Sequence, residues 1–146
     1  MTDSQGYSSQ HVRVEIESSR YEKGQLLVTG TAMSGERFED LVWYEPHGFH
    51  SRPHAGTVGW LVAPGGRRDM GLVMAASDPQ KLPQIEPGEA AMYDNTGNVV
   101  KLTGQGWEFN MDVKITGNLT IEGNIDMTGN ITAGGSIVDG DGNNGA

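Results

Sequence analysis

The sequence predicts an all-β protein with three successive parts: a small barrel, a β-meander and a long C-terminal repeat. Two observations support this fold class. Short segments in the first half alternate apolar and polar residues between turn residues, and no stretch of ten residues shows helical spacing. From Phe109 to Ile137, every odd position is apolar or glycine and no even position is aliphatic. The first pattern predicts half-buried strands, and the second predicts a chain with one dry face and one wet face.

The N-terminal part contains five strand candidates. The segment HVRVEIE (11–17) places Val12, Val14 and Ile16 between polar neighbours, as a half-buried strand requires. The other candidates span residues 25–33, 37–45, 57–64 and 70–76. Five short strands in a chain of 146 residues favour an OB-type barrel. We therefore expect a flexible N-terminus over residues 1–10 and an OB-fold domain over residues 11–78.

A connector and a meander follow the barrel. The segment SDPQKLPQIEPGE (77–89) has three prolines in a short polar run, which is typical of an extended linker. Two strand candidates then flank the turn DNTGN, and a third follows GQG. Both turns carry the Gly or Asn that positive backbone angles favour. Residues 79–108 are therefore expected to form the connector and the meander.

The C-terminal segment repeats every six residues. Gly117, Gly123, Gly129 and Gly135 are six apart, and an Ile or Leu stands two places after each. As a single straight strand, this alternating segment would reach about 90 Å at ~3.3 Å per residue, several times the usual strand length of about 5–6 residues. The chain must therefore bend repeatedly, and the four glycines are the predicted corners.

The dry face of the repeat needs a partner, since one copy of the segment has nothing to bury it against. One solution is a single-chain hexapeptide β-helix of the acyltransferase type, but four hexads make little more than one of its coils. The other is three chains wound about a threefold axis, which leaves no free strand edge. The sequence favours this intertwined trimeric β-helix over residues 109–139, with residues 140–146 as a tip or tail. Its predicted core is Met111, Val113, Ile115, Leu119, Ile121, Ile125, Met127, Ile131, Ala133 and Ile137.

Composition excludes several classes of function. The chain has no cysteine, so disulfides, thiolate zinc sites and cysteine nucleophiles are not available. The net charge of −9 would repel a phosphate backbone, so nucleic acid is not an expected partner. The polar N-terminus does not resemble a signal peptide, and no apolar run approaches the roughly 20 residues of a membrane helix. Synthesis in the cytoplasm is expected.

Two segments could bind a metal ion. His47, His50 and His54 are close enough in sequence to suggest zinc, but a loop broken by Pro and Gly favours a contact role instead. The segment DGDGNN (139–144) resembles the start of a calcium loop without its final Glu. Three copies of Asp139 or Asp141 could still gather a cation at a threefold axis. A polar chain end is the simpler reading, and we predict no metal and no cofactor.

Other polar and aromatic groups do not form a recognisable active site. Trp43, Tyr44 and Trp60 could stack nucleic-acid bases, yet without a basic groove we expect packing in a core or an interface. The segment APGGRRD lacks the strand, Lys and helix of a phosphate loop, so it is expected to be a hairpin turn. No carboxylate pair or nucleophile elbow stands out. We therefore predict that the chain is not an enzyme.

Several motifs resemble one known family. The turn RPHAG, PGG before the next strand, the hairpin from GE to LTGQGWEF and the terminal repeat are similar to the phage baseplate assembly protein V family, especially its Mu-type central spike members. The resemblance covers residues from about 11 to 139. It implies a homotrimer in the virion's tail baseplate, made in the host cytoplasm and docked below a hub protein. It also implies a spike that crosses the host outer membrane when the tail sheath contracts.

The chain departs from this family at its tip. Family members usually end in a His-x-His pair whose three copies hold iron, whereas this chain has no histidine after His54. The iron is therefore not expected. Either a separate tip protein caps the trimer, or the tip folds without metal. The alternative function is a trimeric fibre or adhesin stem that presents a receptor-binding tip, although only seven residues follow Asp139. An acyltransferase or a spike-borne lysozyme is a third reading, without the coils or the domain that it needs.

Overall fold

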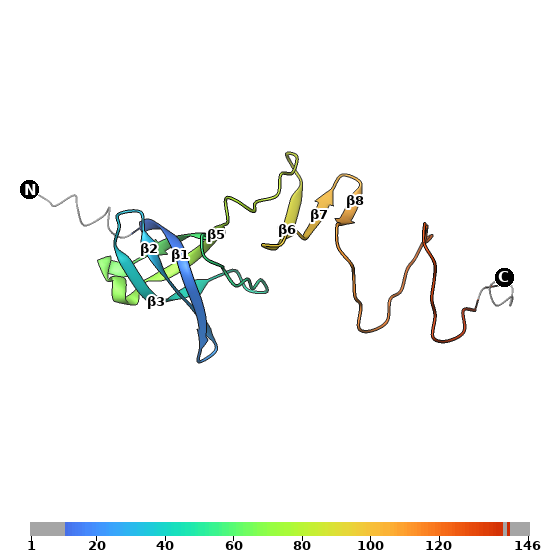
Figure 1. The fold of residues 1–146 in the computed structure, drawn as a ribbon, viewed down its shortest axis with the longest axis horizontal. Coiled ribbons are helices and arrows are strands. Elements are labelled where there is room, and N and C mark those ends of the chain that lie inside the picture. The colour runs from blue at the N-terminus through green and yellow to red at the C-terminus, as the bar shows by residue number, and fades with distance from the viewer. Residues whose placement is uncertain (1–10, 139, 141–146) are drawn as a thin grey trace, which may run out of the picture. The chain divides into compact units, whose positions relative to one another are not determined.

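The computed structural model describes residues 11–138 and 140 and is all-β (Figure 1). The chain divides into two compact units, with the boundary after Asp112. The only helical segments among the described residues are two 3-10 turns, Pro64–Gly66 and Arg68–Met70. No helix in this part of the chain has the length and apolar character needed to span a membrane. The all-β prediction is therefore confirmed.

Five strands close into a barrel at the N-terminal end (Figure 1). They are β1 (His11–Glu22), β2 (Gln25–Ala32), β3 (Arg37–Tyr44), β4 (Val58–Val62) and β5 (Leu72–Ser77). Their order around the barrel is β1-β2-β3-β5-β4, and β4 pairs again with β1. All neighbours are antiparallel except β3 and β5. All five predicted strands are present, and their closure gives an OB-like barrel.

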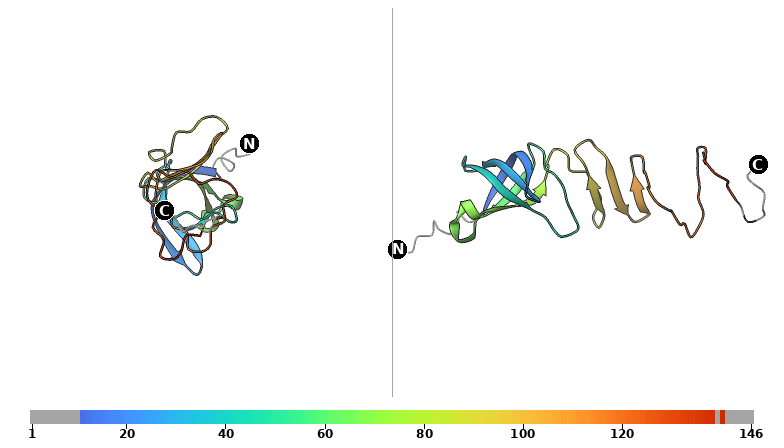
Figure 2. Two further views of the ribbon diagram at one scale, coloured as in Figure 1. Left: turned by 90° about the vertical axis from the view of Figure 1, so that its right-hand side faces the viewer. Right: turned by 90° about the horizontal axis from the view of Figure 1, so that it is seen from below.

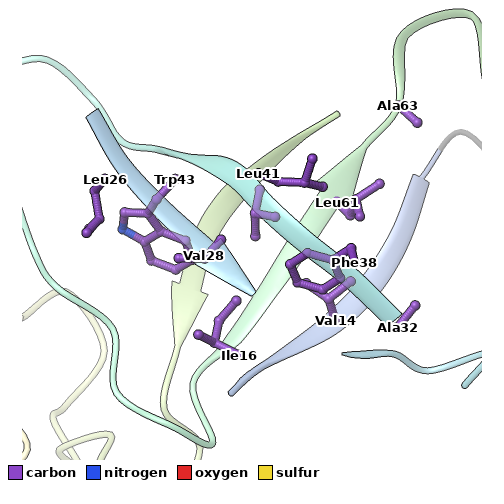
Figure 3. Close-up of a cluster of buried hydrophobic side chains, with 11 residues drawn as sticks. Val14, Ile16, Leu26, Val28, Ala32, Phe38, Leu41, Trp43, Leu61 and Ala63 are labelled. Carbon is purple, nitrogen blue, oxygen red and sulfur yellow. The ribbon is translucent and has the colours of Figure 1, made fainter. Parts of the chain in front are cut away.

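Inward-facing side chains from all five strands fill the barrel (Figure 3). Five of them are fully buried: Val14, Ile16, Val28, Leu61 and Val73. Phe38, Leu41 and Trp43 of β3 complete the filling. Because the barrel closes on itself, the apolar face of each strand meets the others, and this unit has a hydrophobic interior of its own.

A glycine marks the tightest corner of the barrel. Gly30 of β2 lies beside two bulges, one between Ile16 and Ser18 of β1 and one opposite β3. A Cβ atom at Gly30 would lie 2.1 Å from the main-chain oxygen of Glu15. Only a residue without a side chain fits there, because strands approach one another closely where a barrel bends.

The meander is a separate three-stranded antiparallel sheet of β6 (Ala90–Tyr93), β7 (Val99–Thr103) and β8 (Gly106–Phe109). The turn between β6 and β7 is organised by Asp94, whose carboxylate accepts hydrogen bonds from the main-chain N–H groups of Thr96 (2.8 Å) and Asn98 (3.0 Å). Gly106, with φ of +128°, opens β8. The predicted strands on either side of DNTGN and after GQG are confirmed.

Residues 113–138 contain no strand and are all exposed. The chain bends at four residue pairs with a spacing of six: 116–117, 122–123, 128–129 and 134–135. Figure 2 shows this back-and-forth course in the orange to red part of the ribbon. An intertwined trimeric β-helix is an arrangement of three chains, and one chain does not show it. That part of the fold stays a prediction.

Candidate functional site

The most unusual surface of the protein is a line of uncovered apolar side chains along the segment after Asp112. Eight of its large members are between 47% and 65% exposed: Val113, Ile115, Leu119, Ile121, Ile125, Met127, Ile131 and Ile137. We call the odd positions from Met111 to Ile137 the stem stripe. Its apolar side chains are as large as those of the barrel core, and in one chain they remain in water. Continuous apolar surfaces of this kind mark interaction sites.

The glycines of the stem stripe coincide with the bends. Each of the four bends ends at one of them: Gly117, Gly123, Gly129 and Gly135. Gly117 and Gly123 have φ of +146° and +150°, values that residues with a side chain rarely adopt. A Cβ atom at any of the four would meet no other atom within 4 Å in the single chain. Space within one copy therefore does not explain why glycine recurs.

A second apolar surface escaped the sequence analysis. Strand register aligns Ala90, Leu102 and Trp107 in one row across the sheet, and Met92, Val100 and Phe109 in the next. We call these six residues the sheet face. The predicted core begins at Met111, because the unbroken alternation in the sequence starts only at Phe109 and does not extend back through the two hairpins. The turns DNTGN and GQG set the register of both hairpins, and pairing the strands from these turns could have revealed the sheet face.

The predicted histidine loop forms local contacts rather than a metal cluster. The Nδ1 of His50 lies 3.0 Å from a Glu45 carboxylate oxygen, and its Nε2 lies 2.7 Å from the Tyr21 hydroxyl. Burial raises the pKa of Glu45, but hydrogen bonds from Ser51 and His50 outweigh it, so that pKa lies below its usual value. Glu45 thus acts as an ionised acceptor that orders this loop.

The other two histidines lie apart from His50. His54 contacts Asp78 just after β5, with 2.8 Å between Nε2 and the carboxylate, and His47 is exposed. Among the described residues, no group of three or more His, Cys, Asp or Glu is placed to hold a metal ion. The three histidines therefore do not gather as a zinc site would require. The weak cation candidates Asp139 and Asp141 lie outside the described residues.

The aromatic residues of the barrel divide between its core and its outer surface. Trp43 is 7% exposed and packs in the core, whereas Tyr44 and Trp60 are exposed and flank Met74 in one cross-strand row. The three aromatics therefore do not form one stacking platform. The row is instead an apolar strip on the outer side of β3, β5 and β4.

The two arginines after the glycine pair are both ion-paired. Arg67 bonds Asp69 at 2.9 Å, and Arg68 bonds Glu36. Arg67 lies between the two 3-10 turns and Arg68 begins the second, and these turns connect the antiparallel strands β4 and β5. The segment is therefore a hairpin connection, and its positive charges are satisfied within the protein.

Comparison with known families gives one match. Residues 13–80 match the family model described as "Bacteriophage Mu Gp45, N-terminal". The matched residues begin within β1 and end just beyond β5, so they correspond to the barrel. No curated protein gives a significant match to the chain. The match, which covers less than half of the chain, supports a structural protein of the phage tail baseplate.

Proposed function

We propose that this protein is the central spike of a contractile phage tail, a homotrimer that punctures the host outer membrane when the sheath contracts. The stem stripe is the observation that carries the proposal. It is a long apolar surface with glycine at every sixth residue, and no part of the chain that the structure describes covers it. The family match of the barrel supports the location in a baseplate.

In a trimer, the other two copies cover the stem stripe and pair the backbone groups that a single copy leaves exposed. Around a threefold axis, the stem stripe of each chain meets those of the other two, and the apolar side chains leave water. The glycines are the proposed corners, at which each chain crosses close to its neighbours. The backbone N–H and C=O groups of residues 113–138, which form no ladder in one chain, pair between chains. A closed braid also has no free strand edge at which further copies could add.

Such a stem suits a mechanical task. Bending it would require strand pairs of three chains to break together, so axial load passes along the shaft without buckling. Residues 104–146 carry one lysine and six carboxylates, a net charge of −5, and the even positions from Asn110 to Thr132 are all polar. This outer face repels anionic lipid, and the apolar residues stay inside. The spike therefore crosses a bilayer without inserting into it.

The barrel is the proposed docking part. Its outer strip of Tyr44, Met74 and Trp60 carries no charge and is available to a hub protein of the baseplate. The family match covers the barrel and ends before the meander, which is consistent with an attachment role for the barrel and a separate role for the stem.

Two neighbouring substitutions test the trimer. Ile125→Asp puts a carboxylate on the stem stripe, whereas Asn124→Asp puts the same group on the even, polar face. Light scattering should give about 47 kDa, three times 15.7 kDa, for the natural chain and for Asn124→Asp. Ile125→Asp should give the mass of one chain, because three carboxylates cannot be buried together at an axis. A natural chain of 15.7 kDa would contradict the proposal.

The position in the particle separates a spike from a fibre stem. Antibodies against the stem, imaged by electron microscopy on phage tails, should label the centre of the baseplate and should reach the stem after contraction. Label at the ends of peripheral fibres would instead support the receptor-binding alternative.

A further inference from the structure

His54 and Asp78 join the loop between β3 and β4, residues 45–57, to the start of the connector that follows β5. Val58 begins β4 and pairs with Ser77, the last residue of β5, so the end of the loop and the start of the connector meet at the same end of the barrel. Thr57 and Asp78, the residues next to this pair, are both only 8% exposed. The Nε2 atom of His54 lies 2.8 Å from the Asp78 carboxylate, which makes this ion pair the contact between loop and connector.

Asp78 also organises the first turn of the connector. Its carboxylate accepts a hydrogen bond from the main-chain N–H of Gln80 (2.9 Å), and its carbonyl oxygen accepts from the N–H groups of Lys81 (3.1 Å) and Leu82 (3.0 Å). An Asp side chain that bonds the backbone two residues further on commonly forms a turn. Because the same carboxylate contacts His54, the state of the His54 ring acts directly on this turn.

The ring of His54 faces an acceptor at each of its two nitrogen atoms. Nδ1 lies 2.7 Å from the carbonyl oxygen of Ala55, and Nε2 faces the carboxylate of Asp78. A carbonyl and an ionised carboxylate only accept, so both contacts are hydrogen bonds only while both ring nitrogens carry a proton. In a neutral ring, one nitrogen instead turns its lone pair toward an oxygen lone pair, and that contact is lost.

His50 in the same loop does not have this requirement. Its Nδ1 faces the carboxylate of Glu45, but its Nε2 faces the hydroxyl group of Tyr21, which can donate. One ring proton therefore satisfies both contacts of His50. The loop thus contains one histidine whose contacts survive the loss of a proton and one whose contacts do not.

The elements that adjoin His54 carry further titratable and charged groups, since Ile16 of β1 pairs with the end of the loop. These groups are Glu45, His47 and Arg52 in the loop, Glu15 and Glu17 in β1, and Lys81 in the connector. Among the described residues, Asp78 is the only acidic residue with a carboxylate oxygen within 4 Å of a ring nitrogen of His54. The contact therefore depends on the charge of these two side chains.

We propose that His54 and Asp78 form a proton-dependent contact, which holds the first turn of the connector to the loop while His54 is charged and releases it as the pH rises. The sign follows from the form that makes the contact. The closed form binds the extra proton, so its stabilisation is present at acidic pH and is lost when that proton leaves. The inference concerns contacts within one chain and does not depend on the proposed trimer.

Amide hydrogen exchange of the full chain tests this contact. The protection factors of Gln80, Lys81 and Leu82, which are corrected for the intrinsic effect of pH on exchange, should fall about tenfold between about pH 5.5 and about pH 8.5, because this range spans the loss of the His proton and a hydrogen bond to a charged group is lost. His54→Gln does not titrate and should show equal protection at both pH values. His47→Gln removes an exposed histidine of the same loop and should keep the natural profile. Equal protection at both pH values in the natural chain would overturn the inference, as would the natural fall in His54→Gln.

Asp78→Asn distinguishes the loss of the charge from the loss of the turn. An Asn side chain keeps an oxygen for the N–H of Gln80, and its NH2 group can donate to a neutral His54 ring. The fall in protection with pH should therefore disappear in this variant. The ring nitrogen signals of His54, followed by NMR in the natural chain, should change over the same pH range as the protection of the turn. A ring that loses its proton while the protection stays constant would contradict the proposed contact.

Discussion

The barrel and the segment after Asp112 both alternate apolar and polar residues, but only the barrel encloses its apolar side. In the barrel, β4 pairs back to β1, and Val14, Ile16 and Leu61 are fully buried. In the stem stripe, Leu119, Ile125 and Ile131 are 64–65% exposed. The same alternation therefore produces a core in the barrel and an exposed apolar surface in the stem. The difference is that the barrel strands pair back on one another, whereas residues 113–138 form no strand in one chain.

This comparison teaches that glycine has two different uses in the molecule. Gly30 in the barrel is crowded by its own chain, 2.1 Å from the Glu15 oxygen. Gly129 in the stem has open space around it in one copy. If other copies supply the missing neighbours, the two glycines become equivalent in the assembly, and substitutions can test this equivalence.

The largest expected effect is loss of barrel packing. Leu61→Ala removes a fully buried side chain and should cost about 2–5 kcal/mol of the free energy of unfolding. Chemical denaturation followed by tryptophan fluorescence measures this cost. The cost should not change with protein concentration, because this core belongs to one chain. A strong concentration dependence would show that the barrel also depends on other copies.

A smaller loss is expected at the barrel corner. Gly30→Ala should cost about 1–3 kcal/mol, since its methyl group meets main-chain atoms that cannot move aside. Gly104→Ala is the control, as no atom lies within 4 Å of a Cβ there. Thermal unfolding of both variants makes the comparison. Equal melting temperatures would contradict the close approach of β1 and β2.

The stem glycines test whether other copies crowd the stem as the barrel crowds Gly30. In one chain, Gly129→Ala meets nothing and has no positive φ, so the isolated structure predicts no cost. The trimer predicts a cost of about 1 kcal/mol or more per chain, because the methyl group points to the crowded axis. Gly134→Ala, at an even position with equal space, should be neutral or slightly stabilising. Dissociation in denaturant, followed by light scattering, distinguishes the two outcomes.

The smallest effect concerns acid. Hydrogen bonds from Thr96 and Asn98 hold the pKa of Asp94 well below its usual value. Because the folded pKa is lowered, the hairpin keeps this stabilisation at neutral pH and loses it as pH falls below about 3.9, the ordinary aspartate value. Asp94→Asn should remove that part of the acid dependence. Between pH 5 and pH 3, the melting temperature should therefore fall less for the variant than for the natural chain. An equal fall in both proteins would contradict the role of Asp94.

Most of the strands could be predicted from the sequence. Where a predicted strand ends too early, a bulge in the barrel explains the difference. The alternation in β1 reads to residue 17, yet the strand continues to Glu22. The bulge between Ile16 and Ser18 shifts the register, so the pattern breaks while the pairing with β2 goes on. In β3, Asp40 has φ of +54° and a similar break separates Phe38 from Leu41. Local sequence does not encode such irregularities, because they are set by barrel closure.

The candidate surfaces were predictable in part. The stem stripe could be read directly, since its parity runs without a break from Met111 to Ile137. The sheet face could not, because its six residues come from three strands and become one surface only through the register of two hairpins. The aromatic residues Trp43 and Tyr44 are adjacent in sequence and end on opposite sides of β3. Which residues share a surface therefore depends on strand pairing rather than on composition.

Hydrogen exchange of the amides in residues 113–138 tests most directly whether this segment acquires an interior from other copies. Mass spectrometry of the natural chain would follow the exchange at the concentration where its mass is measured. The account predicts protection that lasts hours and disappears in Ile125→Asp, because the amides pair between chains. Exchange within seconds in the natural chain would show a segment that stays in water as one strand, and it would contradict the spike.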